Sequence, residues 1–553
     1  MKNCLLIILL LFIFGKYASS QNYTEILGRP TNSAITMSIL FDQKSEVYWE
    51  YGSVSGNFTQ STPTFVAEKD VPLEQELTEL LPDTKYYYRT RYRQYGVSGS
   101  FEAGAEHTFQ SPRKLGSTFT FAIEADPHLD TNSNSASFAL TLQNILSAKP
   151  DFLIDLGDIF MSEKQPVINQ TVITDRHLLY RPYFNNVCHS VPLFLVLGNH
   201  EGELGWRLDG TANSIPVMAS NTRKLYYPNP LPNSFYTGNI KEEPFVGLRE
   251  NYYAWEWGNA LFIVLDPFWY TLQKPDWGWT LGEEQYNWFK NVITTSQAKF
   301  KFLFCHNLVG GKGNDARGGA EYAGLFEMGG SNIDSTWGFD LHRTSWEKPI
   351  HQLMMDNNAT IFFHGHDHFF GKQEKDGIVY QEVPQPSNKN ITNISATQYG
   401  YVDGILLPGR GYLLVTVSDS STKVDYIKTL LPNEENINNK NRDVAYSYTL
   451  VSSTNGIGEN TACRTQFQLK QNFPNPFKSE TSVNYKIEVA DHVQLKVFNV
   501  YGREVITLVN QHQQPGSYGV TFNAEQLSLP KGLYYCRLTI GNDSQSLKMI
   551  CIK

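Results

Sequence analysis

Five apolar stretches of the sequence each end in residues that are able to bind metal ions or to transfer protons. Aspartate, histidine and asparagine follow these stretches at short spacings. Imidazole and carboxylate groups suit zinc, iron and manganese ions, so the side chains could together form a metal site. In chain order the five groups are Asp126-x-His128, Gly157-Asp158, Gly198-Asn199-His200-Glu201, His306 and Gly365-His366-x-His368.

The stretches before these groups indicate buried strands of an α/β sheet. They are almost continuously apolar, as strands covered on both faces are, and a helical pattern over 135–148 follows the first. In open α/β sheets, ligands bind at the carboxyl ends of the strands. We therefore expect one site that is built from all five strand ends. A single histidine has a structural role more often than a ligand role, so the argument depends on the recurrence.

The five groups resemble the blocks of the calcineurin-like metallophosphoesterase superfamily, which read D-x-H, G-D, G-N-H-[DE], H and G-H-x-H in the same order. The resemblance extends to a helix expected over 281–293 and to a strand pair over 252–266 that is similar to one in purple acid phosphatases. It implies a multidomain chain with an α/β metallophosphoesterase core, a four-layer α/β/β/α sandwich, flanked by two small all-β sandwich domains.

The resemblance also implies two divalent metal ions, zinc, manganese or iron, and a ligand set for each. One ion would be held by Asp126, His128, Asp158 and His368. The second would be held by Asp158, Asn199, His306 and His366, so that Asp158 bridges the pair. A bridging hydroxide would then attack a phosphate ester. By the same resemblance His200 would be catalytic, stabilising developing charge or protonating the leaving oxygen.

The sequence departs from some relatives three residues after Asp158. The position that holds an orienting aspartate in some members, and an iron-binding tyrosine in purple acid phosphatases, is Met161 here. The partner of His200 is therefore not identified, and a purple iron-tyrosinate centre is not expected. Glu201 is a candidate partner only by adjacency, with a structural role equally plausible. His364 is expected to be a core or supporting residue.

A glycine-rich segment over 310–330 follows the fourth strand and should lie over the site. Lys312 or Arg317 could clamp a phosphate oxygen from this loop. The alternative, a solvated insertion without a function in binding, carries equal weight.

The site residues predict a metal-dependent phosphoesterase, with phosphomonoesters as the favoured substrates. A phosphodiesterase or a nucleotidase would use the same ligands, so the substrate class stays open. A catalytically inactive metal-binding surface protein is less favoured because every ligand position is kept. The zinc-protease, serine-hydrolase and P-loop motifs do not occur in the sequence.

The rest of the chain divides by composition into further segments. Residues 1–20 have the charged, apolar and small-residue regions of a signal peptide. Short alternating strands over 21–112 favour a β-sandwich, and its Leu80-x-Pro82-x-Thr84-x-Tyr86 spacing resembles the tyrosine corner of fibronectin type III domains. The catalytic domain is expected over 113–430. An asparagine-rich linker would follow over 431–465, with an added strand at 445–451.

Residues 466–553 resemble the C-terminal sorting domain of the bacterial type IX secretion system, most clearly in QNFPNPF at 471–477. The resemblance implies export across the outer membrane to the medium or the cell surface, with the secretion machinery as a partner. No later segment predicts a transmembrane helix. A formal net charge of -9 and the lack of basic clusters make nucleic acid an unexpected partner. The five cysteines left after signal removal allow at most two disulfides, of unassigned pairing.

Overall fold

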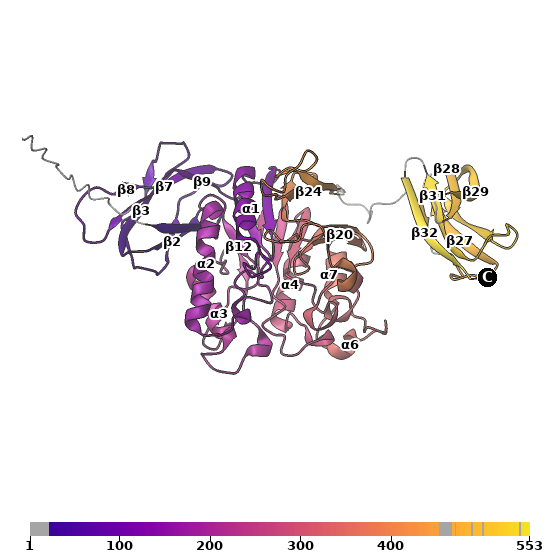
Figure 1. Cartoon of the computed structure of the whole chain (residues 1–553), viewed down its shortest axis with the longest axis horizontal. Coiled ribbons are helices and arrows are strands. Elements are labelled where there is room, and N and C mark those ends of the chain that lie inside the picture. Colours follow the sequence, from indigo (N-terminus) through magenta and orange to yellow (C-terminus); the bar gives the residue numbers. More distant parts are fainter. Residues whose placement is uncertain are drawn as a thin grey trace, which may run out of the picture. The chain divides into compact units, whose positions relative to one another are not determined.

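The computed structural model describes residues 22–452, 467–470, 472–487, 490–499, 503–540 and 543–552. These residues form two compact units, which divide between Ser452 and Ser453 (Figure 1). The signal peptide predicted over 1–20 and Cys463 lie outside the described residues. Within them Cys188, Cys305, Cys536 and Cys551 are all free thiols.

A nine-stranded sheet forms one half of the larger unit. Its inner strands β10, β11 and β12 run parallel, and the segments before and after the catalytic region supply its two edges. In spatial order the strands are β25 (Val444–Val451), β24 (Ser421–Lys428), β23 (Gly411–Val417), β10 (Phe119–Glu124), β11 (Leu153–Asp155), β12 (Leu193–Leu195), β1 (Tyr23–Gly28), β2 (Ile35–Phe41) and β6 (Leu73–Leu77).

An eight-stranded sheet forms the other half, and its strands β17, β18 and β19 are parallel neighbours. The strand pair expected over 252–266 is the antiparallel pair β16–β17. In spatial order the strands are β13 (Thr237–Gly238), β16 (Tyr253–Trp257), β17 (Ala260–Val264), β18 (Phe300–Phe304), β19 (Ile361–His364), β21 (Ile378–Glu382), β20 (Phe370–Lys375) and β22 (Ile405–Leu407).

Apolar side chains of the two sheets meet in one aromatic core. Phe121 of β10 lies 5.1 Å, centroid to centroid, from Phe262 of β17, and Phe194 of β12 stacks on Trp255 of β16 at 4.2 Å. Both faces of the catalytic strands are therefore covered, which explains why their sequences are apolar throughout.

Helices pack on the outer faces of the sheets (Figure 1). Those of the first half, α1 and α2, share a core with β10, β11 and β12, whereas α4 and α7 share one with β17, β18 and β19. The α-helices of the unit are α1 (Ser135–Ala148), α2 (Gln170–Cys188), α3 (Ile215–Tyr226), α4 (Glu283–Thr295), α5 (Phe326–Gly329), α6 (Phe339–His342), α7 (Ile350–Asp356) and α8 (Ala396–Tyr399). None of the helices in the described part of the chain combines the length and the apolar composition that crossing a membrane requires.

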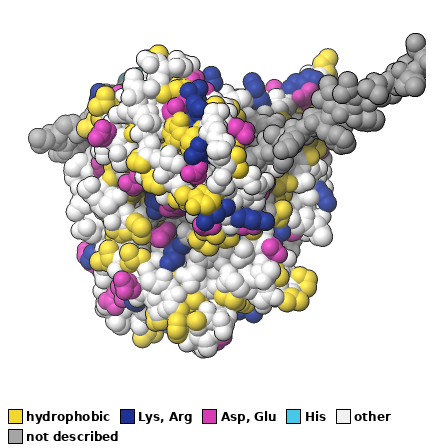
Figure 2. Space-filling view, turned by 90° about the vertical axis from the view of Figure 1, so that its left-hand side faces the viewer, with side chains coloured by type: hydrophobic (Ala, Val, Ile, Leu, Met, Phe, Trp, Pro, Cys, Tyr) yellow, Lys and Arg dark blue, Asp and Glu magenta, His cyan; other side chains and the backbone are white. Residues whose placement is uncertain are grey.

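The other strands of the N-terminal segment form a sheet of their own. Its members are β4 (Gln60–Ser61), β3 (Ser45–Gly52), β7 (Lys85–Gln94) and β8 (Glu102–Ala103), with β5 (Phe65–Ala67) and β9 (His107–Gln110) paired to it. The hydroxyl of Tyr86 accepts a hydrogen bond from the backbone N–H of Leu81 (2.8 Å), as the expected tyrosine corner requires. Ion pairs such as Arg93–Glu46 (2.5 Å) cross this sheet. Basic and acidic side chains are accordingly interspersed over the face shown in Figure 2.

The N-terminal strands are not separate from the catalytic sheet. Strand β1 pairs in parallel with β12, with Gly28 opposite Leu193. The buried guanidinium of Arg181, on α2, donates to the hydroxyl of Thr24 (3.1 Å) and to the carbonyl of Ser38 (3.1 Å). Sequence alternation marks strands but not their distant partners, so this continuity was not expected.

Residues 431–452 lead from the catalytic region to the end of the larger unit. The added strand expected at 445–451 forms as β25, at the edge of the nine-stranded sheet. Tyr448 on this strand donates a hydrogen bond to the amide oxygen of Gln381 (2.9 Å), so the segment contacts the catalytic region.

The second unit contains only strands among its described residues. They form a three-stranded and a four-stranded antiparallel sheet around an apolar core. The strands are β26 (Phe467–Leu469), β27 (Glu480–Ile487) and β30 (Gly516–Asn523) in the first sheet, and β29 (Glu504–Gln513), β28 (Asp491–Asn499), β31 (Gly532–Ile540) and β32 (Asp543–Cys551) in the second.

Candidate metal centre

All five sequence groups follow strands that have a parallel neighbour: the first three follow β10, β11 and β12, and the last two follow β18 and β19. Five of the residues have a left-handed backbone, with φ values of 61° at Asp126, 51° at His128, 58° at Asp158, 79° at His366 and 68° at His368. Such φ values are uncommon for residues other than glycine and cluster at functional sites. The strand ends therefore carry backbone strain where the candidate ligands lie.

The first group that could hold a metal ion consists of Asp126, His128 and His368, whose ligand atoms lie within 4.8 Å of one another. Oδ1 of Asp126 is 3.6 Å from Nε2 of His128 and 3.3 Å from Nε2 of His368. Asp126 and His128 are buried, and His368 is the most accessible of the three.

The second group consists of Asp158, His306 and His366, with the same 4.8 Å limit. Oδ2 of Asp158 lies 3.2 Å from Nε2 of His306 and 3.6 Å from Nε2 of His128 in the first group. One carboxylate oxygen of Asp158 thus faces both groups. This arrangement divides six of the expected ligands between two positions, with Asp158 at the junction.

The donor atoms of both groups suit a metal ion. Oδ1 of Asp126, Nε2 of His128 and Oδ1 of Asn199 are buried and have no hydrogen-bond partner within the described structure. Buried polar atoms rarely lack a partner unless an ion or water satisfies them. An ion at the first position would satisfy the atoms of Asp126 and His128, which both belong to that group.

Hydrogen bonds to the outer ring nitrogens orient two of the histidines. Nδ1 of His306 lies 2.9 Å from the carbonyl of Leu156, and Nε2 of His366 lies 2.7 Å from the carbonyl of Asp315. Because a carbonyl can only accept, each of these nitrogens donates a proton. The opposite nitrogens, 3.2 Å apart, then face the centre of the group, which is the orientation that a metal ligand needs.

The carboxylates control the protonation of the site. Burial lowers the pKa of His306, but the negative charges of Asp158 and Asp126 outweigh this effect and raise the pKa to about 9. Burial raises the pKa of Asp158, and the positive charges of His200 and His306 more than reverse it, which keeps the pKa well below its usual range. Asp158 is therefore ionised, as a bridging ligand must be.

Glu201 has a structural role in positioning the second and third sequence groups. It is fully buried and accepts hydrogen bonds from the backbone N–H groups of Asp158 (3.1 Å), Ile159 (2.6 Å) and Gly198. A side chain on Gly198 would bring its Cβ to 2.3 Å from the backbone nitrogen of Asp158, so glycine is required for this close approach. The contacts of Glu201 thus support a structural role and not the role of partner to His200.

His200 has a partner that was not found from the sequence. Nδ1 of His200 contacts Oε1 of Glu163, which lies in the short 3-10 helix Ser162–Lys164. Nε2 of His200 lies 3.7 Å from Oδ2 of Asp158, so the ring faces the metal groups. Glu163 lies five residues after Asp158 in the sequence, and Met161, in a left-handed conformation, precedes its helix. The position three residues after Asp158, where some relatives carry an aspartate, is Met161.

The loop over 310–330 contacts the centre, as expected. Arg317 donates to Oδ1 of Asp367 (2.9 Å) and to the carbonyl of His366 (2.7 Å), whereas Nζ of Lys312 donates to the carbonyl of Gln398 (2.7 Å). Arg317 thus stabilises the segment that carries the fifth group. The side chains of Arg317 and Lys312 both donate to oxygen atoms of the protein.

His364 lies in the strand, away from the metal groups. Its Nδ1 is 2.8 Å from Oε2 of Glu382, and burial lowers the pKa of His364 to about 3. Oε1 of Glu382 accepts hydrogen bonds from the backbone N–H groups of Asp367 (3.0 Å) and His368 (3.1 Å). His364 and Glu382 therefore support the loop that carries two of the ligands.

The larger unit has a metallophosphoesterase fold, with two candidate metal-ligand groups at the ends of its strands. Residues 119–370 match the family model for the calcineurin-like phosphoesterase, and this region is a calcineurin-like phosphoesterase domain. Residues 471–553 match the model for the secretion system C-terminal sorting domain. This sorting domain marks the chain for type IX export to the cell surface or the medium. No curated protein matches the chain.

Two solved structures show the same fold. PhoD is 15% identical, with a TM-score of 0.57 over 78% of this chain and 90% of PhoD. The purple acid phosphatase PPD1 from yellow lupin (Lupinus luteus) seeds is also 15% identical, with a TM-score of 0.53 over 78% of this chain and 74% of the lupin protein. At this identity the likeness establishes the fold alone.

Proposed function

We propose that the protein is a secreted metal-dependent phosphoesterase that hydrolyses phosphate esters, with phosphomonoesters favoured. The observation that carries the proposal is the meeting of two metal-ligand groups at Asp158, with unpartnered ligand atoms on Asp126, His128 and Asn199. A single structural metal ion would not need a second group of ligands, yet Oδ2 of Asp158 in the second group lies 3.6 Å from Nε2 of His128 in the first.

Seven residues would hold two divalent ions of zinc, manganese or iron. Asp126, His128 and His368 would serve one ion, His306, His366 and Asn199 the other, and Asp158 both. When bound, the ions would polarise the phosphoryl group and activate a water molecule as the nucleophile.

His200 would act as the acid for the leaving oxygen. Burial lowers the pKa of His200, but the charges of Asp158 and Glu163 outweigh burial and raise it. These charges therefore favour the protonated form of the ring. Because Nδ1 is turned to Glu163, a proton is presented from Nε2 on the side of the metal groups.

We further propose the segment boundaries expected from the sequence, with the catalytic domain at 113–430 as a four-layer α/β/β/α sandwich between two small β-sandwiches. Two other functions would use the same ligands: hydrolysis of phosphodiesters or of nucleotides. A metal-binding surface protein without activity is a third reading, which the His200–Glu163 contact disfavours, because binding alone needs no oriented acid.

The test compares hydrolysis of p-nitrophenyl phosphate with that of bis-p-nitrophenyl phosphate by the metal-loaded protein. We expect faster turnover of the monoester and a loss of at least about 1,000-fold in Asp158→Ala. Asp340→Asn, which changes an exposed aspartate of α6, is the control and should leave the rate unchanged. Faster diester hydrolysis would select the alternative substrate, and equal rates for wild type and Asp158→Ala would exclude the two-metal site.

A further inference from the structure

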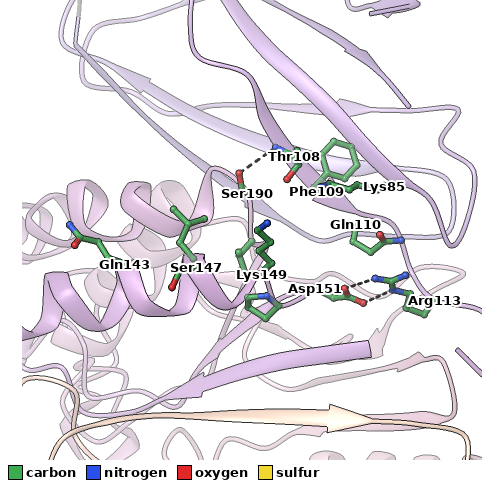
Figure 3. Close-up of a pocket in the computed structure, with 13 residues that line it drawn as sticks. Lys85, Thr108, Phe109, Gln110, Arg113, Gln143, Ser147, Lys149, Asp151 and Ser190 are labelled. Carbon is green, nitrogen blue, oxygen red and sulfur yellow. Dashed lines mark hydrogen bonds and ion pairs between the residues drawn. The ribbon is translucent and has the colours of Figure 1, made fainter. Parts of the chain in front are cut away.

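A cavity lies at the end of the catalytic strands opposite to the metal centre. It has a volume of about 570 Å³, within the range of roughly 300–1,000 Å³ that is typical of small-molecule sites. Its walls come from β7 and β9 of the N-terminal sheet, from the end of α1 and from the segments that precede β11 and β12 (Figure 3). The metal ligands follow the carboxyl ends of the same strands, so the cavity is distinct from the metal centre.

The floor of the cavity is built from paired polar groups. Arg113 donates two hydrogen bonds to the buried carboxylate of Asp151, from Nε to Oδ2 (2.8 Å) and from Nη2 to Oδ1 (2.9 Å). Nε1 of Trp257 donates to the same carboxylate (3.1 Å). On the opposite wall, the hydroxyl of Ser190 accepts from the backbone N–H of Thr108 (3.3 Å), which joins β9 to the catalytic unit. These bonds fix the walls in place before a ligand enters.

The lining carries an excess of positive charge in a chain whose net charge is -9. Asp151 is the only acid in the lining, and Arg113 pairs with it and, at 3.4 Å, with Asp83 outside the lining. Two ammonium groups remain, those of Lys85 and Lys149. Among the described residues neither has a carboxylate partner, although Lys85 lies over the ring of Tyr87 at 5.1 Å. Lys149 is the left-handed residue that ends α1, and Figure 3 shows its side chain rising toward Ser190.

The remaining lining suits a hydroxylated carbon skeleton. The amides of Gln110 and Gln143 offer both donors and acceptors, and hydroxyls come from Ser147 and Thr108. Leu146 and Val191 add apolar surface between them. Most of the pocket surface is therefore apolar or neutral and polar, with the charge confined to a few positions.

We propose that this cavity binds an acidic sugar, a sugar ring that carries a carboxylate or a phosphate group. The ammonium groups of Lys149 and Lys85 bind the acid group, and the amides of Gln110 and Gln143 bind the ring hydroxyls. The inference does not depend on the proposed catalytic function, since none of these residues belongs to the metal centre.

The test is isothermal titration calorimetry on the full chain with three probes. Glucuronate is the carboxylate probe, and the phosphonate analogue of glucose 6-phosphate is the phosphate probe that a phosphoesterase cannot hydrolyse. Glucose is the neutral control. We expect one molecule of at least one anionic probe to bind per chain, at least about tenfold more tightly than glucose. Which probe binds more tightly identifies the acid group.

Two variants place the binding in this cavity. Lys149→Gln combined with Lys85→Gln should weaken binding at least about tenfold, and both lysines are exposed, so the fold should tolerate the change. Lys114→Gln removes the same charge from an exposed residue outside the lining and should have no effect. Failure of both anions to bind, glucose binding of equal strength, or binding unchanged in the double variant would each overturn the proposal.

Discussion

At the scale of single residues, the contact between Glu163 and His200 gives the sharpest prediction about the mechanism. Replacing Glu163 by Gln removes a negative charge that helps to raise the pKa of His200 and a contact that orients its ring. We expect kcat to fall about 10- to 100-fold, with little change in KM. The loss should grow as the leaving group becomes more basic, since poor leaving groups need the proton most. A series of aryl and alkyl phosphates measures this dependence.

Two further variants test whether the loss of activity comes from the missing charge on Glu163 or from a disturbed fold. Glu163→Asp keeps the charge and should restore part of the loss, whereas Lys164→Gln changes an exposed neighbour and should behave as wild type. A loss that is the same for every leaving group would contradict the assignment of His200 as the acid.

Most of the candidate metal ligands, but not the partner of His200, could be found from the sequence. The candidate metal ligands were found because polar groups end five apolar stretches and because their order resembles the metallophosphoesterase blocks, and the structure brings six of the seven into two groups. Glu163 was not predictable. Its approach depends on a three-residue 3-10 helix entered through Met161 at a φ of 52°, and no periodicity in the sequence encodes that turn.

At the scale of elements, a buried ionic network holds the segment that follows β12. Arg249 donates to Oε2 of Glu203 (2.7 Å) and to Oδ2 of Asp266 (2.8 Å), and Arg223 of α3 also binds Glu203. Replacing Arg249 by Met leaves two buried carboxylates short of a partner. We expect a loss of about 3–5 kcal/mol in the free energy of unfolding, measured by urea titration of tryptophan fluorescence.

The matched control for this network is Arg207→Met, at an exposed position in the same connection. Its effect should stay within about 0.5 kcal/mol, as is usual at exposed sites. If Arg249→Met cost no more than this control, the network would not be what holds the segment.

Elements with local patterns were predicted well, and those that depend on distant partners were not. The helix expected over 135–148 forms over those residues as α1, where the side chain of Asn134 caps its first turn by accepting from Ala136 and Ser137. The parallel pairing of β1 with β12 joins residues far apart in the chain. Alternation in each strand is the same whether or not that pairing occurs, so only the structure reveals it.

At the scale of the whole molecule, a histidine pair joins the N-terminal sheet to the catalytic helices. The rings of His107 on β9 and His189 after α2 lie 4.0 Å apart. Burial, with the charge of His189, lowers the pKa of His107 from 6.5 to about 4. Between pH 6.5 and pH 4 the unfolded chain therefore binds more protons at this position than the folded chain does. The free energy of unfolding is unaffected by His107 above about pH 6.5 and decreases as the pH falls toward 4.

This difference can be measured as the change in the free energy of unfolding between pH 7.5 and pH 5. The shift in the pKa of His107 corresponds to a loss of about 2 kcal/mol over that interval. The variant His107→Gln should lose about 2 kcal/mol less than wild type does. His492→Gln, at an exposed position of the sorting domain, should not differ from wild type. An identical pH dependence in all three proteins would show that the pair contributes nothing.

The central claim concerns the whole catalytic unit: two sheets that present two metal groups which share Asp158. The most direct measurement is the metal content per chain by inductively coupled plasma mass spectrometry, on the wild-type protein and on Asp158→Asn after loading and removal of free metal. We predict two ions for wild type and at most one for the variant, because the variant lacks the carboxylate that faces both groups. A single ion in wild type, or two in Asp158→Asn, would contradict it.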